Sequence, residues 1–588
     1  MKVTPWGLAC LLVGALSGPV HAGWDMLTAK PDVVEAWKDI RFGMFVCWGP
    51  VSLTGQEIGW SRANRPGQPQ GGNGPTPIDV YDNLYKKWKP DKFDAHEWVK
   101  VAQDMGARYM IFLVKHHDGF CLYDTKLTDY KITGPESAWK HDVMKDVADA
   151  CHKAGLKVIV YYSQPDWHHP DYKTANHARY NEYFHGQIRE LLTSYGRIDG
   201  LWFDLGGTAK EWDTENLFKM ARSLQPWLII NNRVGLPADF DTPENEVGHF
   251  NDKRPWETNA TLNHQWSWKP NDTIRSLREC IHMLVVCVCG DGNFALNTGP
   301  MPDGRIEPQQ VERFRQMGDW LRKYGQSIYG TRGGPFLAPD ARKRKQEGYY
   351  GQFTIAGGRY WGGSTHKSNA IFLHILRWPA DTILLPPIGK KIVGHSVLTG
   401  GQAQVTQSAE GIAVSVPAAQ HDALDTIVKL ELDGPASAIP TMTAVRSESL
   451  AFGKKATASN FYQKQPEFAP ARAFDDDANS RWGCDYGTHS AWLEVDLGQT
   501  QTIGHAWISE PYDRVRKFEL QRFVDGEWRA FARGTKIGES LDLDFETVTA
   551  QRVRLNLRDC TEGPSIWEFQ LFKPQGKAGP GKSRRKNG

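Results

Sequence analysis

The chain has 588 residues, of which 40% are hydrophobic and 23% are charged, and its formal net charge is +2. This length exceeds what one hydrophobic core serves, so roughly two to four domains are expected. The balanced charge gives no strong overall field and argues against nucleic acid as a partner. The 23 tryptophans offer flat apolar faces of the kind that stack on sugar rings, although most are expected in the core.

The first residues have the pattern of an export signal. Lys2 precedes a short apolar run, and a small-x-small cleavage site ends at Ala22. The run is too short to span a bilayer, and no later stretch is a candidate transmembrane segment. We therefore expect residues 1–22 to be a signal peptide that is removed before Gly23, and the mature protein to be exported, either to the periplasm or outside the cell.

The nine cysteines bear on disulfides and metals. Export makes disulfide bonds possible, and Cys484 with Cys560 is one candidate pair. Cys280, Cys287 and Cys289 crowd one apolar stretch and are expected to be small buried residues. No Cys-x-x-Cys or His-x-x-x-His spacing in the sequence predicts a zinc site.

Apolar strands alternate with amphipathic helices from about Gly23 to Pro335. The sequence predicts strands at 41–46, 108–114, 157–162, 201–204 and 227–231, and helices at 94–105, 142–154, 176–195 and 214–224. Repeated βα units with continuous apolar strands are typical of a parallel sheet covered by helices. A segment of roughly 310 residues fits a (β/α)8-type barrel better than an open sheet, so residues 23–335 are expected to form this α/β domain.

Polar residues follow these predicted strands, each time at the same end. They are Cys47-Trp48, His116-His117-Asp118, the stretch 163–166, Asp204 and Asn232-Arg233. In a barrel all of these strand ends meet on the C-terminal face, where barrel active sites lie. The sequence therefore predicts an active site built from these residues.

Asp204 ends a buried strand and is followed two residues later by a pair of glycines, which tolerate positive φ angles. It either caps this turn or acts in catalysis, and its place among the other strand-end residues favours catalysis. A nucleophilic carboxylate in retaining glycoside hydrolysis needs a second carboxyl group about 5–5.5 Å away. Glu244, on a loop stiffened by Pro243, and Glu257 are both candidates, and the alternative for Glu257 is an ion pair with a neighbouring arginine.

His116 and His117 are adjacent at a strand end, where they can point in different directions. An imidazole that reaches the pocket is suited to hydrogen bonding with sugar hydroxyls, whereas a single histidine is more often a satisfied core residue. The pair favours the binding role. Metal binding is the weaker alternative, because no carboxylate lies at helical ligand spacing.

The pattern changes after the predicted barrel. Short alternating strands between Gly and Pro turns predict a small antiparallel β-sandwich at 336–435, followed by a linker at 435–440 and a second all-β domain at 445–573. The predicted strands include 370–376, 412–416, 492–497, 503–509 and 552–557. Residues 574–588 are basic and rich in Gly, Pro and Ser, so they are expected to form a disordered tail.

Several stretches between residues 38 and 336 carry a family pattern. They are 41–62, 92–130, GLWFDLGG (200–207), INNR (230–233), TPE (242–244), RPWET (254–258), 290–308 and 318–336. Together they resemble glycoside hydrolase family 29, the α-L-fucosidases. The stretches 41–62 and 290–308 are most similar to the subgroup that prefers α-1,3/1,4-linked fucose on branched glycans.

This resemblance implies a retaining exo-α-L-fucosidase with an oligosaccharide or glycoconjugate as its substrate and no cofactor for catalysis. It implies Asp204 as the nucleophile and Glu244 as the acid/base, with Glu257 in reserve because acid/base placement varies across the family. The substrate-binding positions that it implies are Cys47, Glu57, Trp60, His116, His117, Tyr162, Trp202, Arg233 and Trp268.

Cys47 departs from the family pattern, which has a histidine at this position. A thiol is a weak hydrogen-bonding group, and loss of a strong hydrogen bond to a sugar costs about 1.5–3 kcal/mol. The departure leaves a weaker fucosidase, an α-L-galactosidase or a hydrolase of modified fucose as alternatives. A glycan-binding protein without catalysis is the alternative from another class, and the retained Asp204 and Glu244 argue against it.

The last domain resembles the discoidin-like (factor 5/8 type C) jelly roll. The matching stretches are 458–460, AFDDDANSRW (473–482), 491–508 and WEFQLF (567–572). The resemblance implies binding of galactose-type sugars and a structural calcium ion. Asp475, Asp477, Ser480 and Glu568 match the calcium corner, whose oxygen ligands suit that ion. The alternative is a packing module with no ligand.

Overall fold

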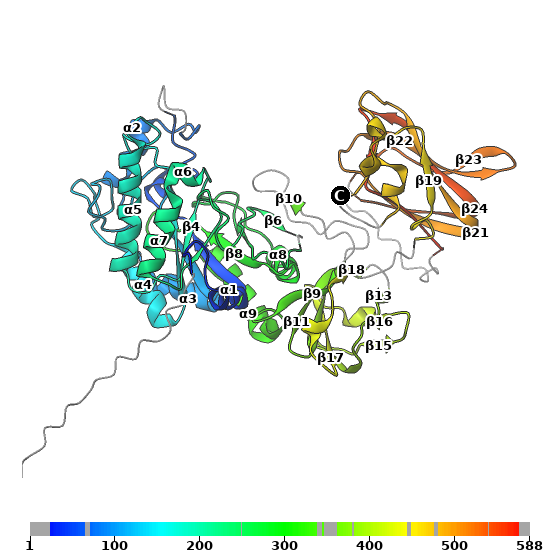
Figure 1. Cartoon of the computed structure of the whole chain (residues 1–588), viewed down its shortest axis with the longest axis horizontal. Helices are drawn as coiled ribbons and strands as arrows, with labels where there is room; N and C mark the ends of the chain where they lie inside the picture. The colour runs from blue at the N-terminus through cyan, green and yellow to red at the C-terminus, as the bar shows by residue number, and fades with distance from the viewer. Residues whose placement is uncertain are drawn as a thin grey trace, which may run out of the picture.

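The computed structural model describes residues 24–64, 71–247, 250–337, 344–345, 361–378, 381–443, 449–475, 480–538 and 540–574. It shows a helix-covered barrel followed by two β-rich domains, as the fold class predicted from the sequence requires (Figure 1). The predicted signal peptide and nearly all of the basic tail lie outside the described residues. Of the helices that are described, none has the length and apolar character needed to cross a membrane.

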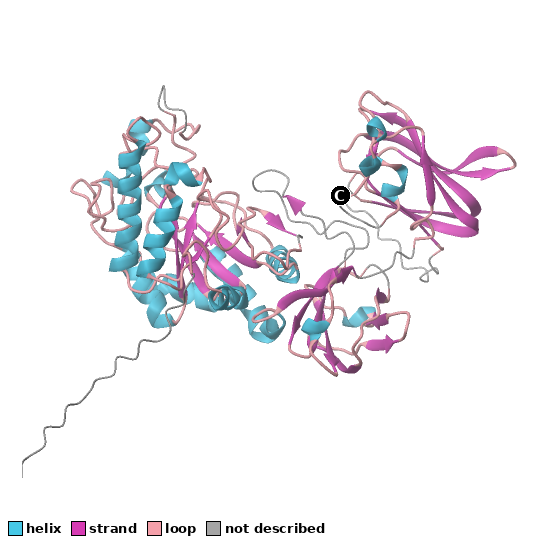
Figure 2. Cartoon of the chain, in the orientation of Figure 1, coloured by secondary structure: helices cyan, strands magenta, loops and turns pink. Residues whose placement is uncertain are grey.

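The barrel strands form one parallel sheet (Figure 2). They are β1 (Phe42–Val46), β2 (Tyr109–Lys115), β3 (Lys157–Tyr162), β4 (Gly200–Phe203), β5 (Ile229–Ile230), β7 (Glu257–Thr261) and β8 (Asn293–Thr298). The order across the sheet is β5-β4-β3-β2-β1-β8-β7. Every residue of β2 is buried, which explains why this strand reads as a continuous apolar run rather than an alternating one.

The segment 239–245 closes the barrel between β5 and β7. Three parallel single-residue bridges join it to its neighbours: Asn231 with Phe240, Asp241 with Trp256, and Glu244 with Asn259. No strand is predicted here from the sequence, because the segment lacks an apolar run and is held by isolated bridges. The closure fixes Glu244 at the edge of the sheet that also carries the strand-end polar residues.

Helices cover the outside of the barrel. They are α1 (Pro31–Ile40), α3 (Ala95–Asp104), α4 (Val143–Ala154), α5 (His177–Ser194), α7 (Thr214–Leu224), α8 (Leu277–Cys289) and α9 (Pro308–Tyr324), with the short α2 (Ile78–Tyr81) and α6 (Ala209–Trp212). Two residues that were predicted to mark the ends of helices do so in the structure. The Asp94 carboxylate accepts hydrogen bonds from the first turn of α3, and Gly155 ends α4 in the left-handed conformation.

The second domain is built on an antiparallel sheet in the order β14-β17-β12-β11-β9-β18, in which only β18 is parallel to its neighbour. Its strands are β9 (Arg332–Leu337), β11 (Gly362–Lys367), β12 (Ala370–Ile375), β13 (Ile383–Leu385), β14 (Ile392–Val397), β15 (Gln404–Gln407), β16 (Ile412–Ser415), β17 (Thr426–Leu432) and β18 (Met442–Thr443), and β10 (Arg344–Lys345) pairs with β6 (Glu246–Val247). One continuous buried core joins this domain to the barrel. The predicted linker is partly wrong, since Ala436 is buried and its N–H donates to Ser368.

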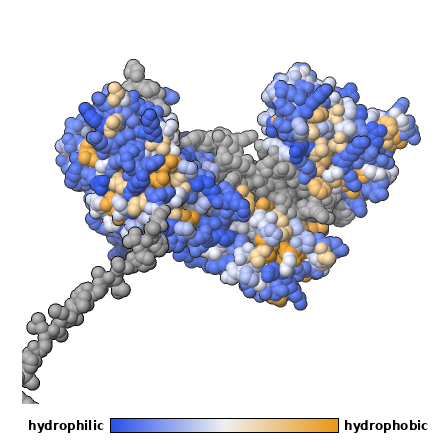
Figure 3. Space-filling view, in the orientation of Figure 1, coloured by the Kyte–Doolittle hydropathy of each residue, from blue (hydrophilic) through white to orange (hydrophobic). Residues whose placement is uncertain are grey.

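The last domain has a core of its own. Its strands are β19 (Lys455–Ala458), β20 (Trp482–Gly483), β21 (Ala491–Ser509), β22 (Val515–Val524), β23 (Glu527–Gly534), β24 (Leu541–Cys560), β25 (Ser565–Ile566) and β26 (Glu568–Phe572). The two strands predicted at 492–509 are a single long strand with a shift in pairing register. Cys484 and Cys560 are buried free thiols rather than a disulfide. The face of the whole molecule in Figure 3 is largely hydrophilic, with small scattered apolar groups.

Candidate active site

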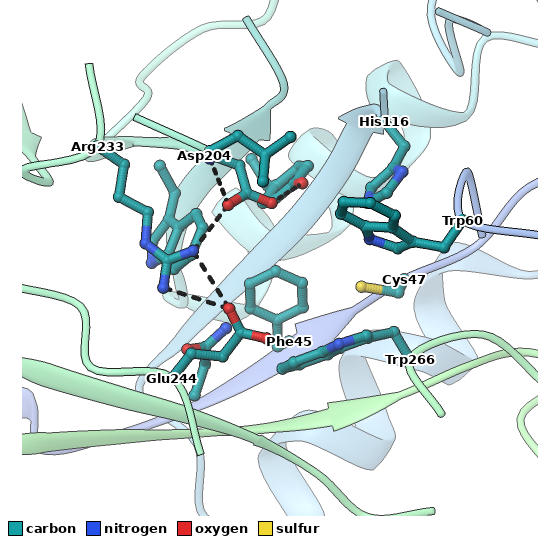
Figure 4. A pocket seen from close by; sticks show the side chains of 12 residues that line it. Phe45, Cys47, Trp60, His116, Asp204, Arg233, Glu244 and Trp266 are labelled. Carbon is teal, nitrogen blue, oxygen red and sulfur yellow. Dashed lines mark hydrogen bonds and ion pairs between the residues drawn. The ribbon is translucent and has the colours of Figure 1, made fainter. Parts of the chain in front are cut away.

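A pocket opens at the C-terminal ends of the barrel strands (Figure 4). The lining residues are Phe45, Cys47, Trp60, His116, Tyr161, Trp202, Asp204, Leu205, Arg233, Glu244, Asn259 and Trp266. The residues that follow β1, β2, β4 and β5 therefore meet in one pocket, as the strand-end pattern predicts.

Asp204 lies directly after β4 and is held by donors on both carboxylate oxygens. Oδ2 accepts a hydrogen bond of 2.6 Å from the Tyr161 hydroxyl, and Oδ1 accepts one of 2.7 Å from Arg233 Nη1. Burial alone would raise the pKa of Asp204, but the charge of Arg233 and the Tyr161 hydrogen bond outweigh it and hold this pKa well below its usual range. Asp204 is therefore an oriented anion.

The turn after Asp204 brings a further donor to the same carboxylate. The backbone N–H of Leu205 lies 2.7 Å from Oδ1 of Asp204. Leu205 has a φ of 61°, a left-handed conformation that costs a residue with a Cβ atom about 1–2 kcal/mol. Gln164 secures the turn, because its side chain accepts from the N–H of Asp204 and donates to the carbonyl of Gly206.

Arg233 joins Asp204 to a second carboxylate. Its Nη1 lies 3.2 Å from Glu244 Oε2 as well as 2.7 Å from Asp204 Oδ1. Two hydrogen bonds to Thr242 and the ring of Trp202, 4.9 Å below the guanidinium, fix the arginine. Figure 4 shows both carboxylates on the one guanidinium. Their shared contact with a single nitrogen is compatible with the carboxyl separation of about 5–5.5 Å used in retaining glycoside hydrolysis.

The two histidines are buried and neutral. His117 Nδ1 contacts the Ser163 hydroxyl at 2.6 Å, and the His116 ring stacks on Tyr161. Burial lowers the pKa of both, to about 4 for His117. Within the described part of the chain, His116 Nδ1 and His117 Nε2 have no hydrogen-bond partner, although His117 Nε2 lies 3.5 Å from Asp204 Oδ2. Of the two rings, that of His116 lines the pocket.

The segment after β1 supplies one wall of the pocket. Trp60 is 37% exposed and packs edge-on against His117. The preceding residue, Gly59, donates to the Tyr81 hydroxyl, which donates in turn to the buried carboxylate of Asp118. A Cβ atom on Gly59 would lie 2.3 Å from His116 Nδ1, so only glycine permits this close packing.

Cys47 lies in the lining beside Phe45 and Trp266. Its side chain is nearly fully buried, and burial raises the pKa of the thiol well above its usual value. The group is therefore a neutral thiol, which offers a sugar only weak hydrogen bonding. This position of the pocket is consequently apolar in character.

For two predicted binding residues, a near neighbour in the chain lines the pocket instead. The Tyr162 hydroxyl donates to Gln187 on α5, so this side chain points away from the pocket and Tyr161 takes the site position. Trp268 does not line the pocket, whereas Trp266 does. Successive residues of a strand point to opposite faces, and β3 is apolar on both faces, so no alternation in its sequence distinguishes the two tyrosines.

Glu57 and Glu257 do not line the pocket but support residues that do. The Glu57 carboxylate accepts hydrogen bonds from the backbone N–H groups of Trp266 and Ser267, at 2.9 and 3.2 Å. Glu257 is fully buried inside the barrel and accepts from the Tyr109 hydroxyl and from Trp202 Nε1. Burial raises its pKa to about 7. The structure therefore brings Glu244, and not Glu257, to Asp204.

Five lining residues were missed by the sequence analysis: Phe45, Tyr161, Leu205, Asn259 and Trp266. Asn259 is the one with a usable signal, because it is a polar residue within a buried strand that ends at the same face. The others are apolar or aromatic and were indistinguishable from core residues. These residues line the pocket because of the side of the strand or turn on which their side chains lie.

Two clusters of side chains contain groups that can bind metal ions. His116, His117 and Asp204 offer donor atoms within 4.8 Å of one another, but the Arg233 cation already occupies the carboxylate and disfavours a metal ion there. In the last domain, the Ser480 hydroxyl lies 2.8 Å from Asp475, and Arg472 also contacts this aspartate. Glu568 is buried, and Asp477 lies outside the described residues.

The depressed pKa of His117 predicts a pH dependence of stability. Its pKa is about 4 in the folded protein against 6.5 as the usual value, so the unfolded chain takes up a proton that the folded chain does not. The contribution of His117 is complete above pH 6.5 and is lost as the pH falls towards 4. We expect His117→Gln to reduce the slope of unfolding free energy against pH by about 1 kcal/mol per unit over this window. Urea denaturation at pH 4.5, 5.5 and 6.5 measures it, and an unchanged slope contradicts it.

Comparison with known proteins places these features in a family. A family model described as Alpha-L-fucosidase matches residues 15–326, and a model of the NedA-like, galactose-binding domain matches residues 472–555. The plasma alpha-L-fucosidase of Homo sapiens is 26% identical over 430 residues, which are 67% of this chain and 88% of that protein.

Solved structures of α-L-fucosidases are also similar to this chain. Alpha-L-fucosidase isoenzyme 1 from Paenibacillus thiaminolyticus is 30% identical, with a TM-score of 0.58 over 68% of this chain and 99% of its own. The alpha-L-fucosidase from Vibrio sp. strain EJY3 is 18% identical and matches in fold over 93% of this chain and 99% of its own, with a TM-score of 0.61. On the family model, which covers more than half of its length, the chain belongs to the α-L-fucosidases of glycoside hydrolase family 29 and carries a discoidin-like domain at its C-terminal end.

Proposed function

We propose that the protein is a retaining exo-α-L-fucosidase that removes terminal α-1,3/1,4-linked fucose from glycans. The observation that carries the proposal is the Arg233 guanidinium shared by Asp204 and Glu244 within the pocket. It supplies the pair of carboxyl groups, one of them a firmly ionised and oriented anion, that retaining glycoside hydrolysis requires.

In the proposed first step, an oxygen of Asp204 attacks the anomeric carbon of fucose. The bond from this carbon to the glycosidic oxygen breaks, and the Glu244 carboxyl gives its proton to that oxygen. The product is a fucosyl ester on Asp204. In the second step the Glu244 carboxylate takes a proton from water as the water oxygen attacks the same carbon. Asp204 leaves as a carboxylate, and two inversions give overall retention.

The surrounding residues suit a sugar. The neutral ring of His116 lines the pocket and offers one donor and one acceptor to sugar hydroxyls. His117 supports the nucleophile, since its Nε2 lies 3.5 Å from Asp204 Oδ2. Phe45, Trp60 and Trp266 give apolar surface for the C–H faces and the methyl group of fucose. Tyr161 and Arg233 orient the nucleophile. We infer no cofactor for this reaction, because the chain's own carboxyl groups supply both roles.

A chromogenic aryl α-L-fucoside tests the proposal. The native chain is expected to hydrolyse it, and Asp204→Asn is expected to lower kcat by at least about 10³-fold, because the amide matches the shape but is not a nucleophile. Binding of fucose, measured by calorimetry, should survive the change. A native chain that binds fucose without turnover would instead support a glycan-binding protein.

The choice between Glu244 and Glu257 predicts a dependence on the leaving group. Glu244→Gln is expected to lower kcat/KM by at least about 10²-fold for a sugar leaving group, which needs protonation, and by much less for a dinitrophenyl leaving group, which does not. Glu257→Gln, the matched control, should affect both substrates equally. A leaving-group dependence in Glu257→Gln and none in Glu244→Gln would reverse the assignment.

Cys47 supports a second candidate, an α-L-galactosidase or a hydrolase of modified fucose. The thiol is smaller than the histidine of the family pattern and offers weaker hydrogen bonds, so a sugar with an altered substituent fits the space. We expect Cys47→His to raise kcat/KM for an aryl α-L-fucoside relative to the matching L-galactoside. An unchanged ratio would show that this position does not set the choice of sugar.

We also propose that the protein is exported, on the strength of its N-terminal pattern. For the last domain we propose binding of a galactose-type sugar and a structural calcium ion held by Asp475, Asp477, Ser480 and Glu568. The support for the calcium proposal is the chemistry of these four side chains, whose oxygen atoms are of the kind that calcium takes as ligands.

A further inference from the structure

The loop after β3 holds His117 at two points. The Trp167 N–H donates to the backbone carbonyl of His117 at 2.7 Å, and the Ser163 hydroxyl contacts Nδ1 of its ring at 2.6 Å. The loop itself is anchored by a buried ion pair, in which the Asp166 carboxylate lies 3.0 Å from Lys115 Nζ. The Nδ1 edge of the His117 ring is therefore held by a fixed support.

The Ser163 hydroxyl has a single proton and two neighbours that could take it. Its oxygen lies 2.7 Å from the carbonyl oxygen of Pro165 and 2.6 Å from His117 Nδ1. A hydroxyl and a carbonyl oxygen come this close when a proton lies between them, and only the hydroxyl has one to give. Ser163 therefore donates to Pro165 and uses a lone pair to accept from the ring. It follows that His117 carries a proton on Nδ1.

The second ring nitrogen of His117 is then a bare acceptor beside the nucleophile. Burial lowers the pKa of His117 to about 4, so the ring is neutral near pH 7 and has only the one proton. Nε2 lies 3.5 Å from Asp204 Oδ2, the oxygen that accepts from Tyr161. The opposite tautomer would direct an N–H at this oxygen, and a small movement would close the hydrogen bond.

A further donor on the nucleophile would slow the reaction proposed above. The carboxylate already accepts from Tyr161, Arg233 and the N–H of Leu205. An oxygen that attacks the anomeric carbon gives up negative charge, so a hydrogen bond to it is stronger in the free enzyme than in the transition state. Such a bond raises the barrier. A histidine whose proton stays on Nδ1 can pack beside Asp204 without this cost.

We propose that Ser163 is a positioning residue that fixes the tautomer of His117 and so keeps the imidazole proton away from the nucleophile. The proposal rests on the fucosidase function proposed above, and it assigns a role in that function to a residue that does not line the pocket. It also follows that a substrate group that meets His117 Nε2 must be a hydrogen-bond donor, such as a sugar hydroxyl.

Neutron diffraction from deuterium-exchanged crystals of the full chain locates the proton without any need for turnover. We expect deuterium on Nδ1 of His117 and none on Nε2. Ser163→Ala removes the acceptor of the Nδ1 proton and is expected to move the deuterium to Nε2, with this nitrogen closer to Asp204 Oδ2. Deuterium on Nε2 in the native chain, with or without deuterium on Nδ1, would overturn the proposal.

The rate of the first step measures the consequence of the tautomer. The fluoride of α-L-fucosyl fluoride leaves without a proton from Glu244, so kcat/KM for this substrate reports the attack by Asp204. We expect Ser163→Ala to lower it at least about tenfold, the effect of one hydrogen bond to a charged group. Ser163→Thr keeps the hydroxyl and is expected to retain most of the native rate and the Nδ1 tautomer.

Ser52→Ala is the matched control, because Ser52 is also buried and its hydroxyl donates to a backbone carbonyl, that of Gly49, at 2.8 Å. It should leave kcat/KM for the fluoride unchanged. Equal rates for the native chain and Ser163→Ala would overturn the role of Ser163. A native chain with the Nδ1 tautomer that hydrolyses no fucoside would instead overturn the fucosidase function, and with it the role at the nucleophile, while it confirmed the tautomer.

Discussion

The guanidinium of Arg233 allows two carboxylates to lie close together in a buried pocket. Burial and mutual repulsion would otherwise raise the pKa of at least one of them and neutralise it. The contacts of Nη1 with Asp204 and Glu244 instead keep Asp204 ionised. Asp204 follows β4, Arg233 follows β5 and Glu244 lies in the closing segment 239–245. The arrangement therefore exists only when the barrel is closed. Fold and chemistry are coupled through this one cation.

Layers of side chains inside the barrel support that cation from below. The Trp202 ring lies under Arg233 and stacks on Tyr161, and its Nε1 donates to the buried Glu257. Tyr161 in turn donates to Asp204. Glu257 is thus connected to the site through Trp202, and it lies outside the pocket. At the rim of the pocket, the carboxylate of Glu57 likewise supports a lining residue, because it accepts a hydrogen bond from the backbone N–H of Trp266.

Sequence patterns predicted the fold and the polar residues of the site, because both are signalled by residues that are close together in the chain. Apolar runs marked the strands, end signals such as Asp94 and Gly155 marked the helices, and polar residues at strand ends marked the pocket. What the patterns could not show depends on register and on long-range closure. The choice of Tyr162 in place of Tyr161 is an error of side on β3. The segment 239–245 is held by long-range contacts, among them the bridges of Phe240 with Asn231 and of Glu244 with Asn259.

The central claim is that Asp204 forms a covalent bond with fucose, and trapping that bond tests it most directly. The reagent is 2-fluoro-fucosyl fluoride, whose fluoride leaves readily while the fluorine at C2 disfavours the oxocarbenium-like transition state, so that the ester on the enzyme persists. After incubation of the full chain, proteolysis and mass spectrometry, the account predicts a fluorofucosyl group on the peptide that contains Asp204. A label on Glu244 or Glu257, or inactivation by the reagent without a label on Asp204, would contradict it.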